Sequence, residues 1–174
     1  DVYKRQTSLL EGKEAPTRDA VFAEKNWHDY EDRSRAVRDH RFKYIVNHYA
    51  DLPATPPADA ARSDTFKEMQ RLRAEGLLPE TQSSCFLAPR PREELYDLKE
   101  DPHELRNIAE LPAHGDTLAR LRAEYRQWRV RTQEKTPRIR TPDEFDRVTG
   151  KPTPARIRPR WSKQKMIEEG IILP

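Results

Sequence analysis

Residues 94–109 read Glu-Leu-Tyr-Asp-Leu-Lys-Glu-Asp-Pro-His-Glu-Leu-Arg-Asn-Ile-Ala, and this stretch is the most informative part of the chain. Residues 95–98 suit a short strand with one buried side. Pro102 fixes its own backbone angle and disfavours the helical region for Asp101, so a sharp turn is expected after the strand. Asp101 can then cap a short helix that has Pro102 at its first position. The segment is predicted to be a strand, a corner and a short helix.

The composition predicts a piece that packs on a larger body. The chain has 174 residues, of which 34% are apolar and 36% are charged. Such a polar sequence cannot form a large self-sufficient core at this length. No run of 18 apolar residues exists, which predicts no membrane span. The N-terminus has no signal peptide and no initiating Met, and residues 1–6 are interpreted as a remnant that does not match the rest of the chain.

Two helices are predicted, one before and one after residues 94–109, which are called the diagnostic stretch below. Residues 64–75 form the first, with Asp64 as the candidate N-cap and Gly76 at its end. Residues 115–132 form the second, with Asp116 as the candidate cap. Apolar side chains recur along the second helix at spacings of three and four, which gives one stripe that faces the core. The stripe consists of Leu118, Leu121, Tyr125 and Trp128.

Three further short strands are predicted in the first third of the chain. Residues 20–24, 34–39 and 42–47 have the apolar patterns of strands, and residues 39–41 suit a hairpin turn between the last two. Residues 25–33 are polar and aromatic, which predicts a loop. The proline-rich residues 50–62 also predict a loop.

The basic excess of the chain lies in its last part. The net charge is +3, and residues 135–174 hold ten Lys and Arg, five Asp and Glu, and six prolines. This composition predicts an extended arm, residues 133–174, that is ordered only where it wraps around a larger body. The fold class is therefore α+β, a small antiparallel sheet of about four strands with a covering C-terminal helix, followed by the arm. Three parts are expected: a remnant or linker at 1–19, a folded unit at 20–132, and the arm.

The candidate chemistry begins at His28-Asp29, just after a predicted strand. A loop in this place can present side chains on a rigid scaffold. His28 can donate a hydrogen bond to an anion, and Asp29 can accept one from a sugar hydroxyl. The alternative, which the residues alone favour, is a surface loop whose histidine is hydrogen-bonded within the protein.

The diagnostic stretch resembles the E-L-Y-D-L-x-x-D-P-x-E-x-x-N-L-A segment near the C-terminus of sulfatases of the alkaline-phosphatase-like superfamily. The similarity extends to Ser8–Lys13, to Arg35-Ala36-Val37 and to Arg41–Ile45. The order and spacing are most similar to the N-sulfoglucosamine sulfohydrolase (heparan N-sulfatase)-like bacterial branch, in which a His-Glu pair occupies the position of His28-Asp29. The resemblance implies the C-terminal subdomain of an α/β hydrolase, cut from a longer enzyme.

For the parent enzyme the resemblance implies hydrolysis of sulfate esters or N-sulfates on sugars, with a glycosaminoglycan-type substrate. It implies a formylglycine made from a Cys or Ser upstream of this chain, and a calcium ion whose ligands also lie upstream. This chain then supplies pocket wall and packing but no catalytic residue and no metal ligand, and alone it is expected to be inactive. The implied substrate-contacting residues are His28, Asp29 and Arg35. The implied partners are a sulfated carbohydrate and the N-terminal sulfatase domain, in a periplasmic or secreted enzyme.

Cys85 is not interpreted as the nucleophile. In Cys85-Phe86-Leu87-Ala88-Pro89-Arg90 the Pro and Arg have the wrong spacing for the C-x-P-x-R motif of sulfatases, and the motif comes too late in the chain. A single cysteine also allows no internal disulfide. The chain is expected to use Cys85 as an ordinary thiol.

A different class of function is a non-catalytic module that binds a polyanion or nucleic acid. Trp161 lies among Arg156, Arg158, Arg160, Lys163 and Lys165. Such a run can contact phosphates and stack one base. No nucleic-acid-binding motif accompanies it, so nucleic acid is the less favoured partner.

Overall fold

The computed structural model describes residues 7, 10–12, 18–157 and 163–168. The resemblance at Ser8–Lys13 and the remnant at 1–6 therefore fall largely outside the described residues. Trp161 does so as well.

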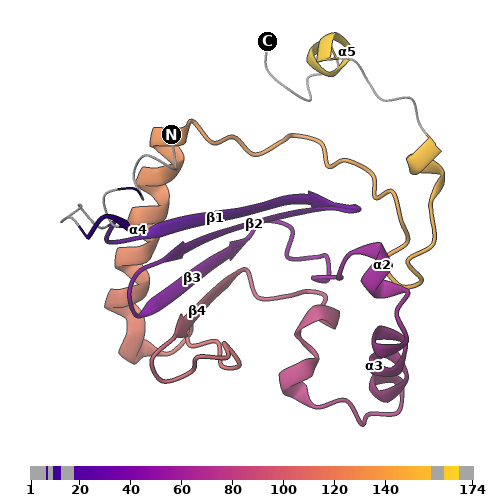
Figure 1. Cartoon of the computed structure of the whole chain (residues 1–174), viewed down its shortest axis with the longest axis horizontal. Coiled ribbons are helices and arrows are strands. Elements are labelled where there is room, and N and C mark those ends of the chain that lie inside the picture. Colours follow the sequence, from indigo (N-terminus) through magenta and orange to yellow (C-terminus); the bar gives the residue numbers. More distant parts are fainter. Residues whose placement is uncertain (1–6, 8–9, 13–17, 158–162, 169–174) are drawn as a thin grey trace.

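The centre of the fold is the predicted antiparallel sheet of four strands, in the order β1-β2-β3-β4 (Figure 1). The strands are β1 (Val21–His28), β2 (Tyr30–Arg38), β3 (Phe42–Asn47) and β4 (Glu93–Asp97). Val37 pairs with Tyr44, and Tyr44 with Leu95, so these three buried side chains share one face. The α+β prediction is confirmed.

The prediction of a loop at residues 25–33 is wrong. β1 continues to His28 and β2 begins at Tyr30, so only Asp29 separates the two strands. Residues 30–33 are all buried, although three of them are charged. The apolar alternation that marks a strand is missing here, because these charged side chains are buried in ion pairs or hydrogen bonds. Asp32 pairs with Arg90 and Arg33 with Glu134, whereas the Glu31 carboxylate accepts hydrogen bonds from the Tyr49 hydroxyl and the Thr141 amide.

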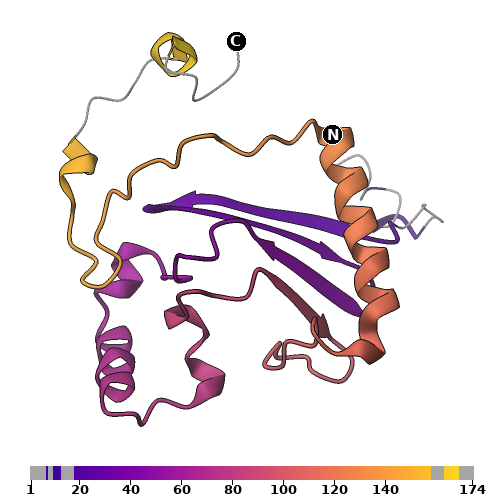
Figure 2. The ribbon, with the colours of Figure 1, turned by 180° about the vertical axis from the view of Figure 1, so that it is seen from behind.

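The long helix covers one face of the sheet (Figure 2). Helix α4 spans Gly115–Thr132 and buries Leu118, Leu121 and Tyr125 against the sheet, while the Trp128 ring stacks on Phe22 at 5.5 Å. The apolar stripe is confirmed. The N-cap is His114 rather than Asp116, and a short 3-10 helix, η3 (Pro112–His114), leads into α4.

A group of short helices, which we call the second limb, lies between β3 and β4 in the sequence. It consists of α2 (Ala58–Ala61), α3 (Asp64–Ala74) and two 3-10 turns, η1 (Glu80–Gln82) and η2 (Ser84–Phe86). Ser63, not Asp64, is the N-cap of α3, because its side chain accepts a hydrogen bond from the Phe66 amide at 3.2 Å. Phe66 of α3 stacks on Phe86 of η2 with ring centres 5.1 Å apart.

The diagnostic stretch forms a strand and a corner, but the predicted short helix is replaced by turns. The Asp101 carboxylate accepts a hydrogen bond from the Arg106 amide at 2.8 Å. The Asn107 side chain accepts from the Leu95 amide at 2.9 Å, and the Ile108 amide donates to the Leu95 carbonyl at 2.9 Å. The polar residues of the motif therefore fold the corner back onto β4.

The arm contacts the rest of this chain at several points between Glu134 and Gly150. Phe145 is buried beside Tyr30 and Ala58, and the Arg62 guanidinium donates to the Gly150 carbonyl at 2.8 Å. This differs from the expectation that the arm is ordered only against a larger body. The arm also contains η4 (Pro154–Ile157) and α5 (Lys163–Glu168). In Figure 1 its first part runs from the end of α4 across to α2.

Candidate functional site

The candidate site is the turn that joins β1 to β2, with His28 and Asp29 at its tip. The pairing register shifts between Lys25 and Trp27, which marks a bulge just before the turn. Asp29 takes a positive φ of 62°, a conformation that aspartate adopts more readily than most residues. Bulges and such turns redirect side chains out of the regular strand pattern. The turn is thus built to present its residues at the end of the sheet.

His28 is the accessible member of the pair. Its side chain is 63% exposed, and its Nδ1 lies 3.4 Å from Asp29 Oδ2. An exposed imidazole with one nitrogen beside a carboxylate can donate from its other nitrogen to an anion or accept from a hydroxyl. This placement suits the predicted contact with a ligand.

Asp29 fastens the turn to the rest of the chain. Its Oδ2 accepts a hydrogen bond from the Ala58 amide of α2 at 2.8 Å. Its backbone carbonyl accepts from the Glu144 amide of the arm at 3.1 Å. The carboxylate therefore holds the tip of the sheet against α2, which leaves less of it for a sugar hydroxyl.

Arg35 lies in an ionic cluster with Arg33, Arg129 and Glu134, in which Arg129 is partly exposed and the other three side chains are buried. The Arg35 side chain is 2% exposed. Its nitrogens donate to Glu134 at 3.0 Å, to Asn26 at 2.7 Å and to backbone carbonyls. The structure brings His28 and Asp29 together but keeps Arg35 inside. A substrate anion would have to displace Glu134 to reach it.

Glu134 connects the arm to the sheet through this cluster. Its carboxylate accepts hydrogen bonds from Arg33, from Arg35 and, at 2.8 Å, from Arg129. Burial would raise the pKa of Glu134, but the charge of Arg33, the hydrogen bond from Arg129 and the charge of Arg35 outweigh burial and lower it. The carboxylate is therefore ionised at neutral pH.

A second buried pair, Asp32 with Arg90, lies on the neighbouring part of β2. Both side chains are 6% exposed, and Lys25 adds a contact of 2.9 Å to Asp32. Burial would raise the pKa of Asp32, but hydrogen bonds from Arg90 and Lys25 outweigh it and lower the pKa. Asp32 and Arg33 of β2 are thus paired with Arg90 and Glu134, which lie far away in the sequence.

These groups predict how stability depends on pH. Burial and the charge of Arg33 lower the pKa of His48 from its usual 6.5, so protonation of the unfolded chain destabilises the fold as the pH falls below 6.5. The carboxylates of Glu134 and Asp32 have pKa values below their ordinary 4.5 and 3.8, so their contribution is lost only as the pH falls below about 4.5.

The expected result is a two-stage decline in the urea midpoint of this chain, shallow between about pH 6.5 and 5 and steeper below about 4.5. The variant His48→Gln should remove the shallow stage and keep the steep one. A midpoint that rises as the pH falls through this range would contradict the assignment.

Three residues that bind the arm to β2 were not predicted from the sequence: Glu134, Asp143 and Arg147. Asp143 accepts hydrogen bonds from Arg147 Nε at 2.7 Å and from Arg140 at 2.9 Å. The Arg147 guanidinium lies 4.9 Å from the centre of the Tyr30 ring. No periodicity marks such residues, because their partners lie on β2, about a hundred residues earlier.

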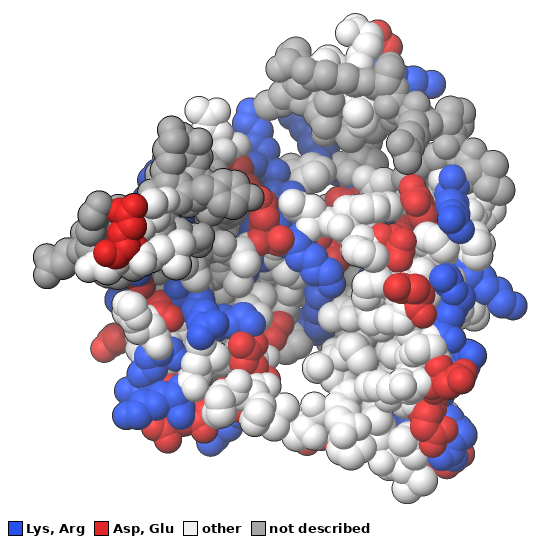
Figure 3. Space-filling model, in the orientation of Figure 1, with Lys and Arg blue, Asp and Glu red and all other residues white. Residues whose placement is uncertain are grey.

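The basic run of the alternative function is only partly described. Arg158, Arg160 and Trp161 fall outside the described residues, and Lys163 and Lys165 lie in α5. Arg156 stacks on the Phe145 ring at 4.7 Å, so it has a packing role. On the face shown in Figure 3, Lys and Arg side chains lie beside Asp and Glu side chains rather than in one continuous positive area. The face shown therefore presents no continuous positive surface to a polyanion.

Metal binding and thiol chemistry find little support within the described part of the chain. Among those residues, no three His, Cys, Asp or Glu side chains converge as a metal site requires. Burial raises the pKa of the Cys85 thiol, which keeps it protonated and a weak nucleophile at neutral pH. Of the helices in the described ranges, none has the length and apolar content needed to cross a bilayer.

The chain is similar to known proteins over part of its length. A scan against models of protein families finds no match. Over 98 residues the chain is 45% identical to the ulvan-active sulfatase of Formosa agariphila; the alignment covers 56% of this chain and 16% of that protein. The chain therefore spans a small fraction of that relative.

Two solved structures show partial similarity. One is a 2-O GAG sulfatase, with a TM-score of 0.46 and 22% identity; the match covers 74% of this chain and 20% of that one. The other was solved with its substrate D-glucosamine-2-N,6-O-disulfate, with a TM-score of 0.43 and 16% identity; the match covers 74% of this chain and 19% of that one.

Proposed function

Because this chain is similar to a sulfatase over part of its length, we propose that it is a C-terminal part of a longer enzyme that hydrolyses sulfate groups on a carbohydrate. The observation that carries the proposal is the 45% identity over 98 residues to a sulfatase named for its action on ulvan. An ulvan-type sulfated polysaccharide is inferred as the substrate from the same similarity, and the glycosaminoglycan-type alternative rests on the sequence motifs alone.

In this proposal the chain forms one wall of the sugar pocket and does not attack the sulfate itself. The exposed His28 at the end of the sheet contacts the sugar or its sulfate. Asp29 and Arg35 support it, since Asp29 ties the turn to α2 and Arg35 holds β2 to the arm. The chain alone is proposed to be inactive.

The reactive groups are assigned to the rest of the longer protein. When present, a formylglycine hydrate would supply the nucleophile and a calcium ion would polarise the sulfate. The described residues of this chain offer no cluster that suits calcium. They bind and orient the substrate instead. The enzyme is proposed to work in the periplasm or outside the cell.

The sugar and the position of its sulfate are a finer proposal. The pattern His28-Asp29, Arg35-Ala36-Val37 and Arg41–Ile45 favours the N-sulfoglucosamine sulfohydrolase-like branch. Asp29 is one methylene shorter than the glutamate of that branch and is bound to α2, so its sugar contacts differ. Release of sulfate from an ulvan oligosaccharide and from D-glucosamine-2-N,6-O-disulfate distinguishes the two substrate types.

The variant His28→Ala in the longer protein tests the proposal. Loss of a hydrogen bond to a charged group costs about 1.5–3 kcal/mol, so kcat/KM for the sulfated sugar should fall about 10-fold to 100-fold. Sulfate release measures the rate, and thermal unfolding checks that the fold is intact.

The matched control is His40→Ala. His40 lies in the β2–β3 turn, at the opposite end of β2. Its substitution should leave the rate unchanged. Equal rates for wild type and His28→Ala would show that His28 does not contact the substrate.

A further inference from the structure

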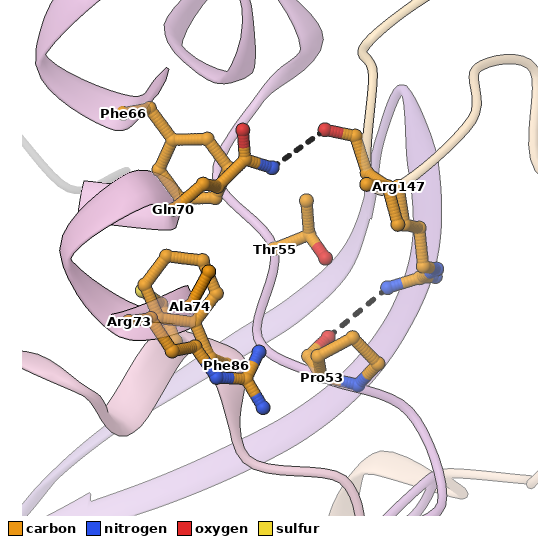
Figure 4. Close-up of a pocket in the computed structure, with 10 residues that line it drawn as sticks. Pro53, Thr55, Phe66, Gln70, Arg73, Ala74, Phe86 and Arg147 are labelled. Carbon is orange, nitrogen blue, oxygen red and sulfur yellow. Dashed lines mark hydrogen bonds between the residues drawn. The ribbon is translucent and has the colours of Figure 1, made fainter. Parts of the chain in front are cut away.

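A cavity of about 530 Å³ lies between the second limb and the arm (Figure 4). Four separate segments line it: the loop at 53–55, helix α3, the turn η2 and the arm at 147–148. The Gln70 amide donates to the Val148 carbonyl at 2.7 Å, which fixes the arm as one wall. The volume lies in the range of small-molecule sites, which is about 300–1,000 Å³.

The walls are largely apolar. Phe66, Ala74, Phe86 and Val148 contribute hydrocarbon surface, and the two phenylalanines stack on each other. Cys85 also lines the cavity, and its thiol is uncharged at neutral pH because burial raises its pKa. A ligand here needs an apolar surface of its own.

Two guanidinium groups give the cavity its charge, and only one of them is already neutralised. Arg147 donates to Asp143, to the Pro53 carbonyl at 3.1 Å and to the Glu31 carbonyl at 2.9 Å. Arg73 contacts the Phe86 ring at 5.0 Å, and among the described residues no carboxylate pairs with it. In Figure 4 its guanidinium points from Phe86 toward Pro53. The cavity thus offers an unneutralised cation beside apolar walls.

The cavity and the His28–Asp29 turn lie at the same end of the molecule. Arg147 lines the cavity with part of its side chain and stacks over Tyr30, the residue that follows Asp29. Helix α2, which the Asp29 carboxylate holds, leads directly into α3. Figure 1 shows the β1–β2 turn, α2 and the arm on this side. A polysaccharide bound at the turn can continue toward the cavity.

We propose that this cavity is a second carbohydrate subsite, which holds a carboxylated or sulfated sugar of the same polysaccharide while another unit reacts at the pocket beside His28. The inference rests on the proposed function. The apolar face of a pyranose ring suits the walls, and its anionic group pairs with the planar guanidinium of Arg73. A chain with an anion on successive sugars fills both places at once.

The test compares Arg73→Ala with wild type in the longer protein, using long and short ulvan oligosaccharides. The KM for the long oligosaccharide should rise about 10-fold while kcat and the values for the short one stay unchanged. Ala74→Phe, which fills the cavity, should have the same effect. Arg71→Ala is the matched control, because Arg71 lies on the same helix and pairs with Glu68 and Glu75. An equal loss on both substrates, or no loss on either, overturns the subsite.

Calorimetry with the long oligosaccharide separates this proposal from the proposed function. Wild-type protein that binds it about 10-fold more tightly than Arg73→Ala supports the subsite even if no sulfate is released. Equal binding by the two proteins overturns the subsite, whatever the enzyme hydrolyses.

Discussion

The variant Glu134→Ala is expected to destabilise the chain by about 3–5 kcal/mol, because it removes the carboxylate from a buried ionic cluster. The side chains of Arg33 and Arg35 are 7% and 2% exposed, and both guanidinium groups bond to Glu134. Without it, two buried positive charges face each other and Arg129. Domains of this kind are stable by about 5–15 kcal/mol, so the loss is a large part of the total.

Urea unfolding measures this change, and two further variants show its cause. Glu134→Gln keeps an acceptor but removes the charge, so its effect should lie between wild type and Glu134→Ala. Glu124→Ala removes a glutamate from an exposed pair with Arg120 on α4 and should cost less than about 0.5 kcal/mol. If Glu134→Ala costs no more than Glu124→Ala, the arm does not anchor β2 as described.

The variant Leu121→Ala should cost about 2–5 kcal/mol, the range for truncating a buried leucine. Leu121 is 0% exposed and lies in the core cluster between α4 and the sheet, with Val37, Tyr44 and Leu95. The truncated side chain leaves a cavity that the rigid strands on one side cannot close. The loss is large because α4 supplies one entire wall of this core.

Val130→Ala is the control for Leu121→Ala, since Val130 lies on the same helix with 78% exposure. It should change the free energy of unfolding by less than about 0.5 kcal/mol. A similar loss in both variants would indicate an effect on the helix itself rather than on packing against the sheet.

The sequence predicted the sheet, the long helix and the diagnostic corner because each leaves a local signal. Leu118, Leu121 and Tyr125 repeat with the period of a helix, and all three are buried. The turn at 39–41 and the strands beside it were predicted because polar residues separate two segments in which apolar and polar residues alternate. The short helix expected after Pro102 did not form, because the Asp101 and Asn107 side chains bond to nearby backbone amides instead.

The candidate site was predicted only in part. His28 and Asp29 were singled out, but the sequence placed them in a loop rather than at a one-residue turn between two strands. Arg35 was expected to contact the substrate, and the structure buries it against Glu134. The cavity beside Arg73 left no signal, because its lining comes from segments spread over residues 53–148.

Three features could be predicted from the residues alone: the α+β class, the strand–corner motif of residues 94–109 and the similarity to sulfatases. These depend on periodicity, turn chemistry and residue order, which are local properties of the chain. Three others appear only in the folded chain: the arm packs on β2, Arg35 is internal and Arg73 faces a cavity. The first two outcomes depend on ion pairs and hydrogen bonds between residues about a hundred positions apart. A charged side chain looks the same in the sequence whether it meets water or a buried partner.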